Sequence, residues 1–238
     1  MVYIRTILLF LWLFFSFSIG TVIAVLTWGR IDLNYYFSKF FSWIALKILG
    51  LKVVVYNKEL LEAKQPAIYM VNHQSGMDVI TFASIFPHRC TIIGKKELIF
   101  VPLLGLYFPA AGNILIDRQK RSAAVSSLGL AAAQIQKRKV SVWIFPEGTR
   151  NRTEEPLLPF KRGGFYLAVQ TGLPIIPVVC EELRKNYSWK FKRIVPGIVK
   201  MKVLPMISTQ GVGPDGIESL VTDVRSRMLD AYLELSRK

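Results

Sequence analysis

Residues 67–78 read AIYMVNHQSGMD and join a short apolar run to a polar segment that contains His73 and Asp78. An uninterrupted apolar run of this length is typical of a strand buried on both faces of a parallel sheet. His73 follows the strand directly, at the end where side chains open into a ligand crevice in sheets of this class. Because five positions on a regular helix correspond to a rotation of about 140°, the two side chains can meet only if His73 lies in a loop and Asp78 in the first helical turn after it.

Taken alone, a histidine and an aspartate at this spacing are more often a solvated loop histidine and a helix-capping aspartate. The interpretation of the pair therefore depends on the rest of the chain. Four more apolar runs are predicted to be buried strands, with a weaker pattern in the last. They lie at residues 113–116, 140–145, 174–179 and 197–204.

Helical patterns alternate with these strands. Residues 122–139 and 163–171 have helical composition, and Gly172 is a stop signal for the second segment. Near the C-terminus, Asp215 and Glu218 have the spacing of a helix cap. The apolar face of that last helix is formed by Ile217, Leu220, Val224, Met228 and Leu235. The alternation predicts the α/β class, with a mixed, largely parallel sheet flanked by helices, and Pro177 inside a strand-like run predicts an edge strand or a bulge.

The N-terminus is strongly apolar, because residues 7–28 contain no charged side chain. At about 1.5 Å per residue a helix of this length can cross the hydrocarbon core of a membrane. A cleaved signal peptide has a shorter apolar region and a small-residue cleavage site, so we expect a retained membrane anchor. Residues 35–56 mix aromatic side chains with lysines, which favours a helix lying in the membrane interface, although a buried helix of the globular domain remains an alternative. We therefore divide the chain into an anchor and interfacial region, residues 1–56, and a globular domain, residues 57–238.

Basic residues dominate, and the net charge is +15. Beside an anchor this charge favours anionic lipids or phosphorylated small molecules as partners over nucleic acid, for which no motif is present. More basic residues follow the apolar segment than precede it, so we expect the globular domain on the cytoplasmic side. Cys90 and Cys180 lie in apolar runs, which predicts buried thiols in a reducing compartment.

Two further segments place chemically active residues at strand ends. The chain has two histidines, which argues against a multi-histidine metal centre. Residues 145–150, FPEGTR, bring a carboxylate, a glycine, a hydroxyl and a guanidinium to the end of a strand, whereas a simple turn requires neither Glu147 nor Arg150. Residues 112–118, GNILIDR, bring Arg118 to the end of another apolar run.

In this order and spacing, the segments resemble the four sequence blocks of the glycerolipid acyltransferases, most of all the bacterial 1-acylglycerol-3-phosphate (lysophosphatidate) acyltransferases. The strong signal is the combination of NHQSGMD at 72–78 with FPEGTR at 145–150. GNILIDR at 112–118, PIIPVV at 174–179 and the basic segment GKKEL at 94–98 support it.

The resemblance implies transfer of a fatty acyl group from acyl-CoA or acyl-carrier protein to the sn-2 hydroxyl of lysophosphatidate, which gives phosphatidate in phospholipid biosynthesis. His73 would be the general base and Asp78 its hydrogen-bond partner, with no covalent enzyme intermediate, metal or other cofactor. Lys95, Arg118 and Arg150 would bind the phosphate of the acceptor. Glu147, Gly148 and Thr149 would complete the acceptor site, with Glu147 bound to glycerol hydroxyls and Gly148 allowing close backbone approach.

Several alternatives remain at this level. The acceptor could be another lysophospholipid or an acylated amino-acid lipid, because these share the same blocks. A serine hydrolase built on Ser75 would lack the Gly-x-Ser-x-Gly elbow, and a non-enzymatic membrane-binding module would not need the four blocks. The apolar residues 98–111 could line an acyl-chain site or pack in the core. By the same resemblance we expect the protein at the inner (cytoplasmic) membrane, with its catalytic domain facing the cytoplasm.

Overall fold

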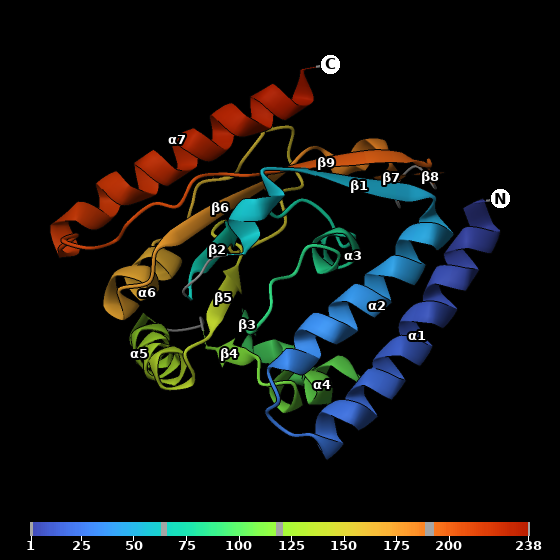
Figure 1. The fold of residues 1–238 in the computed structure, drawn as a ribbon, viewed down its shortest axis with the longest axis horizontal. Helices are drawn as coiled ribbons and strands as arrows, with labels where there is room; N and C mark the ends of the chain where they lie inside the picture. Colours follow the sequence, from blue (N-terminus) through green and yellow to red (C-terminus); the bar gives the residue numbers. More distant parts are fainter. Residues whose placement is uncertain (1, 63–65, 118–120, 189–192, 238) are drawn as a thin grey trace.

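The computed structural model describes residues 2–62, 66–117, 121–188 and 193–237. Its centre is a seven-stranded sheet in the order β1-β9-β6-β2-β5-β3-β4, in which every pair is parallel except β6 with β9 (Figure 1). The strands are β1 Leu51–Tyr56, β2 Ile68–Val71, β3 Cys90–Lys95, β4 Ile114–Ile116, β5 Ser141–Ile144, β6 Ile175–Cys180 and β9 Gly197–Val203. The predicted mixed, largely parallel sheet is therefore confirmed.

Helices cover both faces of this sheet. One face packs against α5 (Arg121–Arg138), α6 (Gly163–Thr171) and α7 (Ile217–Ser236), and the other against α1 (Val2–Leu26), α2 (Asp32–Leu49) and α3 (Asp78–Ala83). The central strand β2 shows the division, because Ile68 and Met70 belong to the first core and Tyr69 and Val71 to the second. Smaller elements are η1 Lys58–Leu61, η2 Lys96–Phe100, α4 Leu104–Ala110, η3 Leu183–Lys185, β7 Tyr187–Ser188, β8 Arg193–Ile194 and η4 Pro214–Gly216.

The two N-terminal helices run antiparallel and lie along the domain (Figure 1). Contacts fix both ends of α1, because Arg5 donates to the Leu49 carbonyl at 3.1 Å and the Gly29 amide donates to the Ala110 carbonyl at 2.7 Å. Within the described residues, α1 is the one helix long and apolar enough to cross a membrane. Its outer side chains are exposed and apolar, as a membrane anchor requires.

Residues 35–56 do not form one continuous helical stretch. Helix α2 ends at Leu49, Gly50 adopts φ +70°, and residues 51–56 form the edge strand β1, paired with β9. This strand was not predicted because Lys52 interrupts its apolar pattern. Helix α2 combines both predicted characters, because Tyr36, Phe40 and Trp43 are exposed while Phe41, Ala45 and Leu49 are buried. The division of the chain after Tyr56 stays a prediction.

Most other predicted elements are confirmed, with three corrections. Strand β3 was missed because its apolar run ends in Gly-Lys. Asp215 lies in η4 and does not cap α7, whose N-cap position is Gly216 without a side-chain hydrogen bond. Pro177 lies in β6, which has β9 on one side and β2 on the other, so the prediction of an edge strand is wrong. The missing N–H of the proline is tolerated there because β9 pairs with β6 only from Val178 onward. Cys90 and Cys180 are free and buried, as predicted.

Candidate active site

Two neighbouring strands bring the first and third sequence blocks together. Strands β2 and β5 pair in parallel, with Met70 opposite Ile144, so the loops that follow them lie side by side. Backbone contacts join the loops, because the Asn151 amide donates to the His73 carbonyl at 2.6 Å and the His73 amide donates to the Glu147 carboxylate at 2.7 Å. The two segments therefore form one unit at the carboxyl edge of the sheet.

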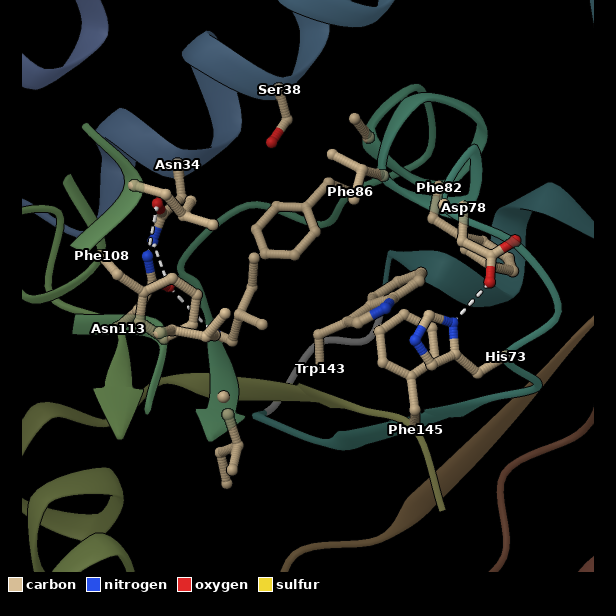
Figure 2. Close-up of a pocket in the computed structure, with 18 of the residues that line it drawn as sticks. Asn34, Ser38, His73, Asp78, Phe82, Phe86, Phe108, Asn113, Trp143 and Phe145 are labelled. Atoms are coloured by element: carbon tan, nitrogen blue, oxygen red, sulfur yellow. Dashed lines mark hydrogen bonds and ion pairs between the residues drawn. The ribbon is translucent and has the colours of Figure 1, made fainter. Parts of the chain in front are cut away.

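His73 and Asp78 form the predicted pair. His73 lies in the loop after β2, and Asp78 is the first residue of α3, with 2.5 Å between His73 Nδ1 and Asp78 Oδ2 (Figure 2). The same Oδ2 accepts the backbone amides of Gln74 at 2.8 Å and Ser75 at 3.0 Å. These contacts hold Asp78 as a hydrogen-bond acceptor, and they leave the other ring nitrogen of His73, Nε2, unengaged by Asp78.

Packing fixes the position of this pair. Asp78 is only 1% exposed, and the His73 ring stacks on Phe145, with 4.1 Å between the ring centroids. Figure 2 shows His73, Asp78 and Phe145 at one end of a cavity, with Trp143, Phe82 and Phe86 beside them. A histidine oriented by a buried aspartate and stacked on an aromatic ring is suited to transfer a proton at a defined place.

Glu147 is placed differently from the three residues that follow it. Its carboxylate is 1% exposed and does not line the cavity; it accepts the His73 amide at 2.7 Å and the Leu158 amide at 3.0 Å. Burial raises the pKa of Glu147 above its usual value, and the two backbone hydrogen bonds oppose that shift in part. With one backbone amide bound to each oxygen, Glu147 holds the loop of His73 in place. Its expected contact with glycerol hydroxyls stays a prediction.

The cavity has a volume of about 470 Å³ and extends from His73 between α2, α3, β3 and α4. Lys95, Gly148, Thr149 and Arg150 line it together with His73 and Asp78, and their roles in binding the acceptor stay predictions. Gly148 adopts φ +71°, which a glycine tolerates and which turns the chain tightly after Glu147. Arg118 lies outside the described residues.

The remaining walls are mostly apolar. They are formed in part by Phe41, Phe82, Phe86, Leu98, Phe108 and Trp143. Leu98 and Phe108 come from residues 98–111, so this segment does line the cavity. A cationic rim with an apolar interior fits a ligand that has a charged head and a hydrocarbon tail.

Nothing in the sequence indicated that α2 takes part in the site. Asn34 of α2 lies at the far end of the cavity, where its side-chain amide donates to Asn113 Oδ1 at 3.0 Å and to the Ala111 carbonyl at 3.1 Å (Figure 2). The Tyr107 hydroxyl donates to Asn34 Oδ1 at 3.3 Å. A lone asparagine in an aromatic helix was the available signal, but its partner Asn113 lies 79 positions away in the sequence.

Ser75 also lines the cavity but is not paired with His73. Its hydroxyl oxygen accepts the Met77 amide at 3.2 Å, a local turn contact. No base among the described residues is therefore positioned to activate Ser75, and the arrangement fits a histidine that acts on a ligand hydroxyl better than one that acts on a protein nucleophile.

Known proteins resemble this chain over most of its length. Residues 52–181 match the family model described as Acyltransferase. The 1-acyl-sn-glycerol-3-phosphate acyltransferase alpha of Mus musculus is 40% identical over 190 residues, which cover 79% of this chain and 66% of the relative. The putative 1-acyl-sn-glycerol-3-phosphate acyltransferase acl-2 of Caenorhabditis elegans is 39% identical over 208 residues, covering 85% of this chain and 71% of the relative. This chain thus spans about two thirds of the length of these relatives.

A solved structure matches along the whole chain. The 1-acyl-sn-glycerophosphate (LPA) acyltransferase PlsC from Thermotoga maritima has a TM-score of 0.76 and 25% identity, covering 100% of this chain and 99% of that one. The family model, the curated relatives and this structure agree with the resemblance carried by the four blocks. The chain belongs to the glycerolipid acyltransferase family.

Proposed function

We propose that this protein transfers a fatty acyl group from a thioester donor to the sn-2 hydroxyl of lysophosphatidate, which gives phosphatidate for phospholipid synthesis. The observation that carries the proposal is the His73–Asp78 pair at the junction of a cationic rim and an apolar cavity. The matched proteins named above are acyltransferases that act on 1-acyl-sn-glycerol-3-phosphate, a lipid with one phosphate head and one tail.

In this mechanism the substrate hydroxyl is the nucleophile. His73 Nε2 takes the hydroxyl proton as the oxygen attacks the thioester carbon, and the Asp78 carboxylate stabilises the imidazolium through Nδ1. When the tetrahedral intermediate collapses, the carbon–sulfur bond breaks and His73 returns the proton to the leaving thiolate. A positioned general base typically contributes about 10²- to 10⁴-fold in rate.

The exposed cations at the rim would hold the acceptor phosphate. Lys95 and Arg150 both line the cavity that contains His73, and an arginine can bind two phosphate oxygens at once. Gly148 and Thr149 directly precede Arg150 in the loop after β5 and also line the cavity. The apolar walls would receive hydrocarbon tails, which removes apolar surface from water.

The donor and the location belong to the same proposal. A basic surface attracts the phosphates of coenzyme A and an acidic carrier protein alike, so we propose a thioester of either carrier. With α1 as an apolar anchor and basic residues mostly after it, we propose that the catalytic domain faces the cytoplasm at the inner membrane.

The test uses the purified full chain in detergent with lysophosphatidate and both donor types. We expect His73→Ala to lower kcat at least 100-fold, while Ser75→Ala, in the same loop, retains most of the activity. Equal loss in Ser75→Ala would indicate a hydrolase-type nucleophile instead. A panel of other lysophospholipids and acylated amino-acid lipids then tests the acceptor, and the assignment fails if lysophosphatidate is the poorest of them.

A further inference from the structure

The segment between β3 and α4 exposes a compact group of apolar side chains. Phe100 is 83% exposed, the neighbouring Ile99 and Val101 are also exposed, and η2 contains no buried residue. We call residues 99–101 the Phe100 tip. Leu106 on α4 adds a further exposed apolar side chain close to it. Exposure of a phenylalanine to this extent leaves apolar surface in water unless a partner covers it.

The fold holds the Phe100 tip in place. The Gly105 amide donates to the Val101 carbonyl at 2.7 Å, and a Cβ at Gly105 would lie only 2.1 Å from the Ile99 carbonyl oxygen. Leu103 adopts φ +62°, a strained conformation for a bulky residue. The Thr21 hydroxyl of α1 donates to the Leu103 carbonyl at 3.2 Å. The exposed position of the tip therefore results from a specific backbone geometry.

The residues that follow the Phe100 tip pack against the N-terminal helix α1. Ala24 of α1 is buried against Tyr107 and Ala110 of α4, the helix that begins just after the tip. The outer side of this end of α1 is apolar and exposed at Val22, Leu26 and Trp28. Lys95 and Lys96 precede the tip, and Lys96 pairs with Asp117 at 3.4 Å. An apolar tip preceded by lysines is the pattern of a segment that enters a lipid interface.

The same segment also borders the cavity. Leu98 precedes the Phe100 tip, Leu104 follows it, and both line the cavity that contains His73. The tip itself does not line the cavity. The exposed tip is therefore flanked in the sequence, on both sides, by residues of the cavity wall.

We propose that the Phe100 tip inserts among the lipid tails of the bilayer beside α1 and brings the cavity wall at Leu98 and Leu104 to membrane depth. A bilayer is favoured over a protein partner because the tip is joined to α1, the candidate membrane anchor, through Leu103 and α4, and α1 exposes apolar side chains at that end. The proposal rests on the proposed function only in that the substrate is a membrane lipid. Insertion itself is measured without turnover.

The first experiment measures depth. Phe100→Cys is labelled with an environment-sensitive fluorophore and reconstituted in vesicles of equal parts phosphatidylcholine and phosphatidylglycerol, some with nitroxide on their acyl chains. Leu130→Cys on α5, whose native side chain is 65% exposed, is the matched control. Cys90 and Cys180 are buried, so labelling of the unmodified chain gives the background.

We expect nitroxide lipids to quench the label at position 100 at least twofold more than the label at position 130. Equal quenching would overturn the proposal. The proposal would also be overturned if the fluorophore at position 100 left the aqueous environment only as the protein concentration rises, because a second copy of the chain would then be the partner.

The second experiment measures delivery of substrate. We expect Phe100→Asp to lower acyl transfer to a vesicle-borne acceptor at least tenfold and to change transfer to a detergent-solubilised acceptor less than twofold. Leu130→Asp should change neither. An unchanged ratio of vesicle to detergent activity in Phe100→Asp would overturn delivery through the tip, whereas absence of acyl transfer in the unmodified chain would instead refute the proposed function.

Discussion

At the residue scale, the hydrogen bonds of the site distinguish groups that perform chemistry from groups that hold them. Asp78 and Glu147 are both carboxylates with 1% exposure, in blocks that meet at adjacent strand ends. Asp78 contacts the His73 ring, whereas Glu147 contacts only backbone amides of the described residues. Asp78 therefore acts on the imidazole directly, and Glu147 acts through the loop that carries it.

Glu147→Gln tests this difference. The carboxylate accepts two backbone amides, and a glutamine can accept only one, so we expect a kcat several-fold lower because the loop of His73 shifts. The pKa of Glu147 is raised by burial, so the folded protein takes up this proton more readily than the unfolded chain. The free energy of unfolding of the unmodified chain should therefore rise relative to that of Glu147→Gln as the pH falls through the raised pKa.

The measurement is urea unfolding of both proteins from about pH 7 to about pH 4, within the range over which carboxylates titrate. Comparison of the two proteins cancels the groups that they share. A difference that stays constant with pH, or that changes in the opposite direction, would show that the buried Glu147 does not titrate as its surroundings require.

The sequence alone was sufficient to place residues whose hydrogen-bond partners lie a few positions away. The placement of His73 in a loop and Asp78 in the first helical turn followed from their spacing, and the structure confirms it. The sequence did not show that Glu147 binds the loop of His73, because burial and backbone partners 74 and 11 positions away are not visible in a short motif. Asn34 was missed for the same reason, since its partners are brought close only by the tertiary fold.

At the element scale, α2 is joined to the domain by a buried polar contact at the far end of the cavity. Asn34→Ala removes the hydrogen bonds to Asn113 and to the Ala111 carbonyl. The buried polar atoms of both partners then lack these hydrogen bonds. We expect a loss of about 1–3 kcal/mol in the free energy of unfolding, measured in detergent. Ser38→Ala is the control, because Ser38 lies on the same helix, lines the same cavity and has no side-chain hydrogen bond to the part of the chain that the structure describes. Equal stability of the two variants would contradict a structural role for Asn34.

Element order shows where sequence patterns reach their limit. The strands β2, β4, β5 and β6 were predicted correctly because a short uninterrupted apolar run between turn residues is typical of a buried strand. Strands β1 and β3 were missed because lysine and glycine interrupt their apolar patterns. Pro177 is accommodated in an interior strand because the pairing of β6 with β9 begins only at Val178. Pairing partners of this kind are properties of the whole sheet and have no local signal.

At the scale of the whole molecule, α1 is both a candidate anchor and a part of the folded domain. Phe17 of α1 contacts Phe37 and Phe41 of α2 and Tyr107 of α4, with ring centroids 5.4 to 5.8 Å apart. Gly20 allows this packing, because a Cβ there would lie 2.4 Å from the Phe37 ring. A simple tether would make no such contacts, so the inner and outer faces of α1 should respond differently to change.

Removal of residues 1–28 should therefore destabilise the rest of the chain instead of releasing a soluble domain. Loss of a buried aromatic contact costs about 3–5 kcal/mol, which corresponds to a fall in Tm of about 10 °C for a chain of this size. The exposed surfaces of Phe37 and Tyr107 should also cause aggregation, measured by light scattering.

The matched control keeps α1 and changes only its outer face, with Phe14→Ser and Ile19→Ser, both exposed positions. This double variant should keep its Tm in detergent within about 2 °C, since exposed substitutions cost little, and should bind vesicles more weakly. A truncated chain that stays monodisperse with an unchanged Tm would mean that α1 only attaches the enzyme to the membrane. The opposite pattern, a folded outer-face variant and an unstable truncation, would mean that the helix at the membrane surface also supports the wall of the cavity.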